Sequence, residues 1–347
     1  MKIMIDDAVW GFSKIFSQFG EVITLPGRQI SNQSLQNCEA LIVRSRTRVD
    51  EGLLKNSKIK FVGSTVAGLE HIDQSYLEDN GIAFSSAQGC NANAVAEYVI
   101  SAIANLSNDL NFKLFGKTLG IIGVGNVGRR LDFKAKQLGI KTLLNDPPRE
   151  SAEGSEHFVS LEKALEADIV TFHTPLTFSG LFPTHNLLDK HNFNHIKKDA
   201  IIINAARGGI INELIWETTP TKANIIDCWE NEPNINPNLQ KSAYWATPHI
   251  AGHSIDAKFM GSFMIYQELC KFLKEPINDQ IENLINPELR EIKEGNLHDT
   301  LNSIYPFIND DLAIKDVSNF EDYRRNYPKR FEWKHFKTQF ELPNSND

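Results

Sequence analysis

Three polar side chains follow or lie between short apolar segments in the second half of the chain. Arg207 follows segment 201–206, His249 follows segment 245–248, and Glu232 lies in the loop between them. An imidazole can accept a hydroxyl proton near neutral pH, and a neighbouring carboxylate can orient it. A guanidinium can hold a substrate carboxylate with two hydrogen bonds. Together the three side chains predict a site that oxidises a secondary alcohol.

Taken singly, each of these side chains has an ordinary structural explanation. Arg207 can form a surface ion pair, Glu232 can be a solvated loop acid before Pro233, and His249 can be a strand-end histidine with satisfied hydrogen bonds. For an isolated residue these explanations are the more common ones. The catalytic hypothesis therefore requires that the fold bring the three side chains to one edge of a sheet.

A glycine-rich turn predicts a second site. Gly123, Gly125 and Gly128 lie between the apolar segment 118–122 and a helical pattern that begins near Asn126. Such glycines permit a tight turn, a close approach of the backbone to a pyrophosphate and close helix–strand packing, while the helix N-terminus supplies N–H donors. The spacing and its context predict a dinucleotide cofactor.

An acidic residue at the end of the next predicted strand bears on which dinucleotide is used. Asp146 follows segment 141–145, where a carboxylate can accept hydrogen bonds from the adenosine ribose. Its charge would repel a 2'-phosphate and so favours NAD over NADP, although Arg149 is close enough in sequence to weaken that preference. The alternative is a glycine-rich turn followed by a helix-capping aspartate, with no ligand.

Short apolar segments that alternate with helical patterns predict an α/β fold. We expect two doubly wound parallel-sheet (Rossmann-like) domains plus a small C-terminal dimerisation module. A helical pattern from about Asn93 is expected to bridge the domains, and a second one, Ser254 to Leu273, to pack back onto the first. The predicted domains are 1–100 with 253–286, which bind substrate, 101–252, which bind NAD, and 287–347. The expected strands are 2–5, 40–43, 61–64 and 82–85 in the first domain, and 118–122, 141–145, 169–173, 200–204, 223–227 and 244–246 in the second.

The composition narrows the classes of partner. A formal net charge of -8 argues against a nucleic-acid surface or an anionic membrane surface, because both require a basic patch. We find neither a secretory signal nor a membrane-spanning segment, so we expect a cytoplasmic protein. The cysteines are scattered and fit reduced thiols better than disulfides or a metal site; they are Cys38, Cys90, Cys228 and Cys270.

Five motifs, taken in order, resemble those of the D-2-hydroxyacid dehydrogenase family, and the resemblance covers about residues 1 to 286. They are Gly123 to Gly128, His173 to Thr177, Asn204 to Gly209, Asp227 to Pro233 and Thr247 to Gly252. The resemblance implies that Arg207, Glu232 and His249 are the catalytic residues and that no metal is used. It also implies that Asp227 meets the nicotinamide carboxamide of NAD. The implied cofactor-binding residues are Gly123, Gly125, Asn126, Val127, Gly128, Asp146, Thr174, Ala206, Asp227 and Gly252.

Further segments resemble the branch of this family that acts on a phosphorylated sugar acid, including 43–47, 63–68, 89–92 and 146–149. That resemblance implies NAD-dependent oxidation of 4-phospho-D-erythronate to (R)-3-hydroxy-2-oxo-4-phosphobutanoate, a step toward pyridoxal 5'-phosphate. Arg44 and Arg46 supply cations for a phosphate, and Ser45 and Thr65 supply hydroxyl donors. The alternative is that both arginines lie on a solvated loop.

Two departures from that branch concern the substrate site and the dimer. His253, an expected substrate contact, stands where we expect tyrosine. The stretch from Phe320 to Trp333 resembles the C-terminal dimerisation module of the branch, which implies a homodimer, but the module is shorter than usual.

Two other functions stay open at this point. One is a dehydrogenase for another 2-hydroxy acid, such as glycerate or 3-phosphoglycerate. The other is an NAD-sensing binding protein like the transcriptional corepressors of the same fold, since a fold does not fix a function.

Overall fold

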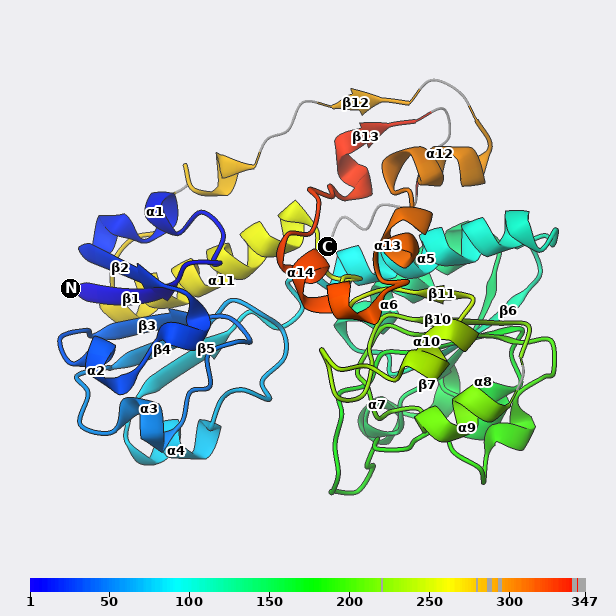
Figure 1. Ribbon diagram of the computed structural model, residues 1–347, viewed down its shortest axis with the longest axis horizontal. Helices are drawn as coiled ribbons and strands as arrows, with labels where there is room; N and C mark the ends of the chain where they lie inside the picture. Colours follow the sequence, from blue (N-terminus) through cyan, green and yellow to red (C-terminus); the bar gives the residue numbers. More distant parts are fainter. Residues whose placement is uncertain (220, 279, 286–288, 293–294, 339–341, 343–347) are drawn as a thin grey trace. The chain divides into compact units, whose positions relative to one another are not determined.

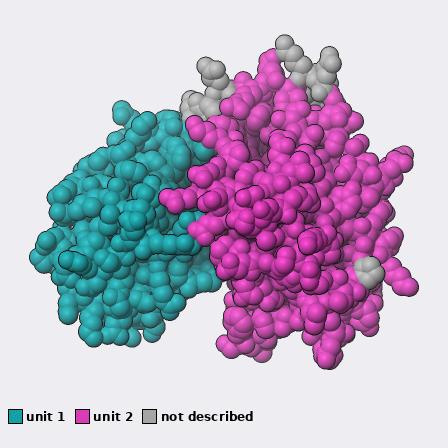
Figure 2. Space-filling model, in the orientation of Figure 1, with its two compact units in different colours: residues 1–91, 254–288 teal, residues 92–253, 289–347 magenta. Residues whose placement is uncertain are grey.

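The computed structural model describes residues 1–219, 221–278, 280–285, 289–292, 295–338 and 342. The chain divides into two compact units (Figure 2). Unit 1 comprises Met1–Asn91 with Ser254–Glu288, and unit 2 comprises Ala92–His253 with Leu289–Asp347. Unit 1 is therefore discontinuous in sequence, because the chain leaves it at Asn91 and returns at Ser254.

Unit 1 contains a five-stranded parallel sheet of order β2-β1-β3-β4-β5 (Figure 1). Four of its strands were expected; β2 was not, because it is an edge strand with Glu21 exposed and the other residues only half-buried. The strands are β1 (Lys2–Asp6), β2 (Glu21–Leu25), β3 (Ala40–Val43), β4 (Phe61–Ser64) and β5 (Ala83–Ser86).

Short helices and one long helix accompany this sheet. The long helix α11 (Ile255–Leu273) packs on β4 and β5, as its apolar spacing predicted (Figure 1). Its Phe259, Phe263 and Tyr266 join the buried core of the sheet. The short helices are α1 (Phe12–Ile15), α2 (Asn32–Leu35), α3 (Glu51–Leu54) and α4 (Gln74–Asp79).

Unit 2 contains a six-stranded parallel sheet of order β11-β10-β9-β8-β6-β7. The strand order reverses between β6 and β8, and the carboxyl ends of strands at such a switch point form the ligand crevice of doubly wound sheets. The strands are β6 (Thr118–Ile122), β7 (Lys141–Asn145), β8 (Ile169–Phe172), β9 (Ile201–Asn204), β10 (Ala223–Ile226) and β11 (Trp245–Ala246).

Helix α5 and the C-terminal segment share the core of unit 2. Helix α5 packs against α6 and α12, and Leu301, Phe307 and Trp333 lie in the same buried cluster as the apolar residues of α5. The helices of this unit are α5 (Ala92–Asp109), α6 (Asn126–Gln137), α7 (Pro147–Glu153), α8 (Leu161–Leu165), α9 (Glu213–Thr218), α10 (Pro237–Ser242), α12 (Leu297–Ile304), α13 (Ile308–Ala313) and α14 (Phe320–Arg325). The short strands β12 (Arg290–Glu291) and β13 (Phe336–Lys337) pair with each other.

The observed units differ in their bounds from the expected domains. The boundary that we placed at residue 100 lies at Asn91, because α5 packs as one continuous helix in the core of unit 2. The residues from Leu289 onward belong to unit 2 and do not form a separate compact unit. The assignment of substrate binding, NAD binding and dimerisation to these regions stays a prediction.

None of the helices within the described residues is both long and apolar enough to cross a membrane.

Candidate active site

The glycine turn joins β6 to α6 at the switch point of the unit 2 sheet. Gly123 has a φ of 90°, which favours glycine, and a Cβ at Gly128 would lie 2.2 Å from the Gly123 carbonyl oxygen. Gly125 has a φ of -75°, and a Cβ there would meet open space. The turn thus needs glycine at two positions for its own packing, while at Gly125 the backbone faces room for a ligand. Asn126 and Val127 form the first turn of α6.

Two buried polar atoms at the end of β8 fit a bound cofactor. His173 Nδ1 and Thr174 Oγ1 are buried without a hydrogen-bond partner in the structure. Gly123 is adjacent to them, since a Cβ on it would lie 2.8 Å from the Thr174 amide nitrogen. Unsatisfied buried groups are rare, and a ligand is one common explanation. The neighbouring strand ends and the open face at Gly125 therefore fit a dinucleotide, with Thr174 as one donor.

Asp146 lies at the end of β7, next to the glycine turn. Its carboxylate accepts hydrogen bonds from the amides of Val124 at 2.7 Å and Arg149 at 3.1 Å, so it also caps α7. The guanidinium of Arg149 binds Glu153 at 2.6 Å and the Val124 carbonyl at 2.5 Å. Arg149 is thus held by groups of the protein itself, and the part of Asp146 in cofactor choice stays a prediction.

The imidazole of His249 and the carboxylate of Glu232 are joined by a hydrogen bond. Nδ1 of His249 lies 2.8 Å from Oε2 of Glu232, and the two side chains are 28% and 18% exposed. Burial tends to raise the pKa of Glu232, but the charge and hydrogen bond of His249 and the amide of Trp229 outweigh it and hold the pKa below its ordinary value. The carboxylate is therefore ionised at neutral pH and oriented toward the imidazole, as expected of a base with its orienting acid.

Arg207 follows β9, which lies beside β10 in the sheet, and its turn is shaped by Asn204. The Asn204 side chain accepts from the amide of Ala206 at 3.1 Å and donates to the carbonyl of Arg207 at 2.8 Å. Gly208 abuts the next loop so closely that a Cβ would lie 2.0 Å from the Trp229 carbonyl oxygen. The structure thus brings the Arg207 turn against the loop that carries Glu232.

Asp227 is buried at the end of β10 and is committed to groups of its own chain. It accepts hydrogen bonds from the hydroxyl of Thr247 at 2.7 Å and the amides of Ile250 at 2.7 Å and Ala251 at 3.1 Å. Thr247 in turn lies 2.7 Å from the hydroxyl of Tyr98 on α5. Asp227 therefore fixes both sides of His249, a role that the sequence analysis did not foresee.

Cys228, Glu232 and His249 also place one potential metal-ligand atom each within 4.8 Å of one another. Burial raises the pKa of the Cys228 thiol well above its ordinary value. Since metals bind the thiolate, this burial opposes metal binding. The acid–base pair is the better explanation of the cluster.

The remaining predicted residues of unit 2 line the same strand ends. Ala206 is buried and its carbonyl accepts from Nη1 of Arg207 at 2.8 Å. Gly252 and His253 follow the His249 loop, and the His253 ring lies 5.8 Å from the ring of Tyr327.

The predicted phosphate residues lie at the carboxyl edge of the unit 1 sheet. Arg44, Ser45 and Arg46 follow β3, and Thr65 follows the adjacent strand β4. Ser45 is exposed, the two arginines are half-buried, and Nη1 of Arg44 donates to the Ala8 carbonyl at 3.3 Å. The Thr65 hydroxyl donates to the Val43 carbonyl at 3.3 Å. The two neighbouring strand ends therefore gather cations and hydroxyls, as a phosphate site requires.

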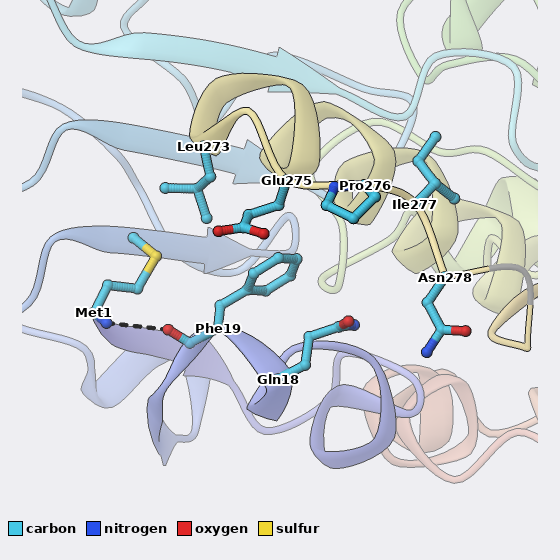
Figure 3. Close-up of a pocket in the computed structure, with 8 residues that line it drawn as sticks. All are labelled: Met1, Gln18, Phe19, Leu273, Glu275, Pro276, Ile277 and Asn278. Atoms are coloured by element: carbon cyan, nitrogen blue, oxygen red, sulfur yellow. Dashed lines mark hydrogen bonds between the residues drawn. The ribbon is translucent and has the colours of Figure 1, made fainter.

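A separate pocket in unit 1 lies at the amino end of the sheet (Figure 3). Met1, Phe19, Leu273 and Glu275 are among its lining residues, and the N-terminal amine donates to the Phe19 carbonyl at 3.0 Å. The eight described residues that line it combine the Glu275 carboxylate and the amides of Gln18 and Asn278 with five apolar side chains. That lining lacks the paired imidazole and carboxylate found at the strand ends of unit 2, so we do not assign the chemistry to it.

Comparisons with known proteins point to one family. Residues 95–251 match the family described as D-isomer specific 2-hydroxyacid dehydrogenase, NAD binding domain. The chain is similar to the erythronate-4-phosphate dehydrogenase of Ruthia magnifica subsp. Calyptogena magnifica, with 59% identity over 99% of both chains. It is 48% identical to that of Hydrogenovibrio crunogenus, over 95% of this chain and 92% of the relative. For Escherichia coli the identity is 38% over 96% of this chain and 92% of the relative.

Solved structures share the fold at lower identity. The NAD-bound 3-phosphoglycerate dehydrogenase of Entamoeba histolytica is 24% identical with a TM-score of 0.66, covering 82% of this chain and 98% of that one. The NAD-dependent formate dehydrogenase of Staphylococcus aureus in complex with NAD is 21% identical with a TM-score of 0.64, covering 81% and 98%.

Proposed function

Because the chain belongs to the erythronate-4-phosphate dehydrogenase family, within the D-isomer specific 2-hydroxyacid dehydrogenases, we propose that it oxidises 4-phospho-D-erythronate. The product is (R)-3-hydroxy-2-oxo-4-phosphobutanoate, the cofactor is NAD, and the reaction is a step toward pyridoxal 5'-phosphate. The observation that carries this proposal is the His249–Glu232 pair at the ends of β11 and β10, beside the Arg207 turn.

The acid–base step belongs to His249. When bound, NAD accepts the hydride that leaves C2 of the hydroxy acid. Since Nδ1 of His249 faces Glu232, Nε2 is the nitrogen that accepts the proton of the C2 hydroxyl. The ionised Glu232 stabilises the imidazolium that this transfer creates, and it holds the ring in orientation.

Arg207 supplies the cation for the substrate carboxylate. Its planar guanidinium can bind the C1 carboxylate with two hydrogen bonds and draw charge from the neighbouring C2 oxygen as the carbonyl forms. The Asn204 contacts and the close approach of Gly208 to Trp229 fix the turn that presents this side chain.

The cofactor is held by the β6–α6 turn and the neighbouring strand ends. Gly123, Gly125, Asn126, Val127 and Gly128 form the pyrophosphate turn, and Asp146 accepts from the adenosine ribose. Thr174, Ala206, Asp227 and Gly252 line the remaining length. The open space at Gly125 and the unsatisfied hydroxyl of Thr174 support this assignment.

The 4-phosphate is bound by Arg44, Ser45, Arg46 and Thr65, and His253 contacts the substrate. The support is that two neighbouring strand ends of unit 1 gather two cations and two hydroxyls. If these arginines only served to solvate a loop, nothing would require two cations and two hydroxyls to lie at the ends of adjacent strands.

The protein acts in the cytoplasm as a homodimer. The C-terminal resemblance supports the dimer, and so do the exposed apolar side chains of Ile308 and Leu312 on α13, which are 44% and 59% exposed. Sedimentation of the purified protein tests the dimer, and fractionation of cells tests the location.

The substrate assay compares NADH formation with 4-phosphoerythronate, erythronate and 3-phosphoglycerate, in the presence of a 2-oxo acid that recycles bound cofactor. We expect kcat/KM for 4-phosphoerythronate to exceed that for erythronate by about 100-fold, because the phosphate adds charge-assisted hydrogen bonds. Preference for another acid would support the catalytic mechanism but show that the substrate assignment is wrong. If no NADH forms with any of the three acids, an NAD-sensing binding protein becomes the favoured function.

Substitutions test the phosphate residues separately. Arg44→Met and Arg46→Met are expected to lower kcat/KM for 4-phosphoerythronate while erythronate oxidation changes little. The matched control is Arg48→Met, because Arg48 lies on the same loop, is 81% exposed and pairs with Asp50. If kcat/KM falls equally for 4-phosphoerythronate and erythronate, the assignment of Arg44 and Arg46 to the phosphate is wrong.

A further inference from the structure

The backbone of His249 has a left-handed conformation, with a φ of 55°. This conformation is unfavourable for a residue with a Cβ and persists only where neighbouring groups hold it. The direction of the imidazole depends on this backbone, so whatever holds the peptide also aims the side chain at Glu232.

One side of this loop is held by Asp227, through the N–H groups of Ile250 and Ala251. These two bonds fix the donors of the peptides that follow His249. They leave the carbonyl oxygens of the same stretch to other partners, because each peptide has both a donor and an acceptor.

The other side is held by two arginines of the C-terminal segment. Nε of Arg324, on α14, donates to the carbonyl oxygen of His249 at 3.2 Å. Nη2 of Arg330 donates to the carbonyl oxygen of Ala251. The loop is thus bound at its N–H groups by Asp227 and at its carbonyl groups by Arg324 and Arg330.

The segment that supplies the arginines is itself firmly anchored. The guanidinium of Arg330 lies 4.8 Å from the ring centre of Tyr305. The hydroxyls of Tyr305, Tyr323 and Tyr327 all donate to the carboxylate of Asp310, at 2.5, 2.7 and 2.8 Å. A carboxylate with three phenol donors fixes the spacing of the segment on either side of α14.

The same segment also binds the strand before His249. The carboxylate of Asp311 accepts from the amide of Ala246 at 2.9 Å, and the Phe307 ring lies 4.9 Å from that of Trp245. Contacts therefore run along the whole of β11 and the loop that follows it. A segment that only joined two subunits would not need to bind the carbonyl groups of His249 and Ala251.

We propose that Arg324 and Arg330 are positioning residues for His249: by binding the carbonyl oxygens of His249 and Ala251, they hold the imidazole against Glu232. The C-terminal segment thereby forms part of the active site of its own chain. The catalytic part of this inference rests on the proposed function, while the geometric part does not.

The decisive variant is Arg324→Met, which keeps the length of the side chain and removes the donor. We expect kcat to fall about 10- to 100-fold, as for other small displacements of a reacting group, with KM for the hydroxy acid and Kd for NADH changed less than about three-fold. Arg324→Lys retains a donor and is expected to recover most of the loss.

The matched control is Arg325→Met, which removes the same charge from the next residue of α14, an exposed position. Its kcat is expected to stay within about two-fold of the wild-type value. The proposal is overturned if Arg324→Met matches this control, or if it loses NADH binding as much as turnover and Arg324→Lys rescues neither. Arg330→Met is expected to act in the same direction, and the Arg324 series decides the matter if that variant does not fold.

A measurement without substrate separates this proposal from the assigned activity. The proton between Nδ1 of His249 and Glu232 should give a strongly downfield NMR signal that His249→Ala removes. We expect Arg325→Met to keep the signal and Arg324→Met to lose it. Retention of the signal in Arg324→Met would refute the positioning role, even if the wild-type protein oxidised none of the acids tested.

Discussion

The carboxylate of Asp227 accepts a hydrogen bond at 2.7 Å from the amide of Ile250, the residue directly after His249. Asp227 is 1% exposed, and burial raises the pKa of its carboxyl group although His249 and the hydrogen bonds oppose that rise. Because its carboxylate accepts hydrogen bonds from Thr247, Ile250 and Ala251, its first effect is to fix the His249 loop. A contact with the nicotinamide carboxamide stays a prediction.

Asp227→Asn is expected to impair both stability and turnover. In asparagine an NH2 group takes the place of one carboxylate oxygen. That NH2 group then faces a backbone N–H, so two donors meet and one hydrogen bond is lost. We expect the free energy of unfolding to fall by about 1–3 kcal/mol, and kcat to fall as well. Urea unfolding and steady-state kinetics measure the two effects, and unchanged values of both would contradict this role.

Removal of either principal catalytic side chain is expected to abolish turnover while leaving NAD binding intact. His249→Ala removes the base and Arg207→Ala removes the carboxylate cation, so we expect kcat/KM to fall at least about 100-fold. Fluorescence titration with NADH provides the control for the cofactor site. Near-normal rates in either variant would refute its assigned role.

Alanine substitutions at two positions of the glycine turn are expected to affect different properties: one NADH binding, the other the free energy of unfolding. Gly125→Ala adds a methyl group to open space, so it should preserve the free energy of unfolding and weaken NADH binding, because the pyrophosphate must approach there. Gly128→Ala places the methyl group 2.2 Å from the Gly123 carbonyl oxygen and should destabilise the fold by about 1–3 kcal/mol. Unfolding curves and titrations of both variants check the contrast. Equal effects would show that Gly125 does not face the cofactor.

The charge of Asp146 is expected to decide the preference for NAD over NADP. Asp146→Ser should erode that preference, and Asp146→Asn should do so while still able to cap α7 through its side-chain oxygen. The ratio of kcat/KM for the two cofactors is the measured quantity. If neither variant moves the ratio, the ribose assignment is wrong.

His173 is expected to make stability depend on pH. Burial lowers its pKa to about 3, whereas the unfolded side chain titrates near about 6.5. Between these values the unfolded chain binds a proton that the folded chain does not, so stability falls as the pH falls, by at most about 1.4 kcal/mol per pH unit. Urea unfolding of cofactor-free protein between pH 6 and 4 should show a flatter slope for His173→Gln. Equal slopes would contradict the assignment.

The sequence predicted the sheets well where strands are fully buried. Segments 40–43 and 201–203 are continuous apolar runs, which are typical of buried parallel strands, and the structure contains them in β3 and β9. The edge strand β2 lacks such a run, because only one face of it needs to be buried. The boundary near residue 100 was displaced because a helix that crosses a predicted boundary cannot be divided between two cores.

The candidate site was predictable to the extent that it follows from strand order. Arg207, Glu232 and His249 follow three strands that neighbour one another in the sheet, so their approach follows from the alternation of strands and helices. The arginine contacts with the His249 loop could not be foreseen. Arg324 lies 75 residues beyond His249, and a hydrogen bond from a side chain to a carbonyl oxygen leaves no periodic pattern in the sequence.

The discontinuity of unit 1 sets the order in which the protein can fold during synthesis. Helix α11, which covers β4 and β5, is encoded after the whole second sheet. As the chain leaves the ribosome, the apolar face that will meet Phe259, Phe263 and Tyr266 therefore stays uncovered until more than 150 further residues have emerged after Asn91. The second unit closes later still, because Leu301, Phe307 and Trp333 of its core follow α11 in the chain. Neither core is therefore complete until the last quarter of the chain has begun to emerge, and apolar surface stays exposed in both units until then.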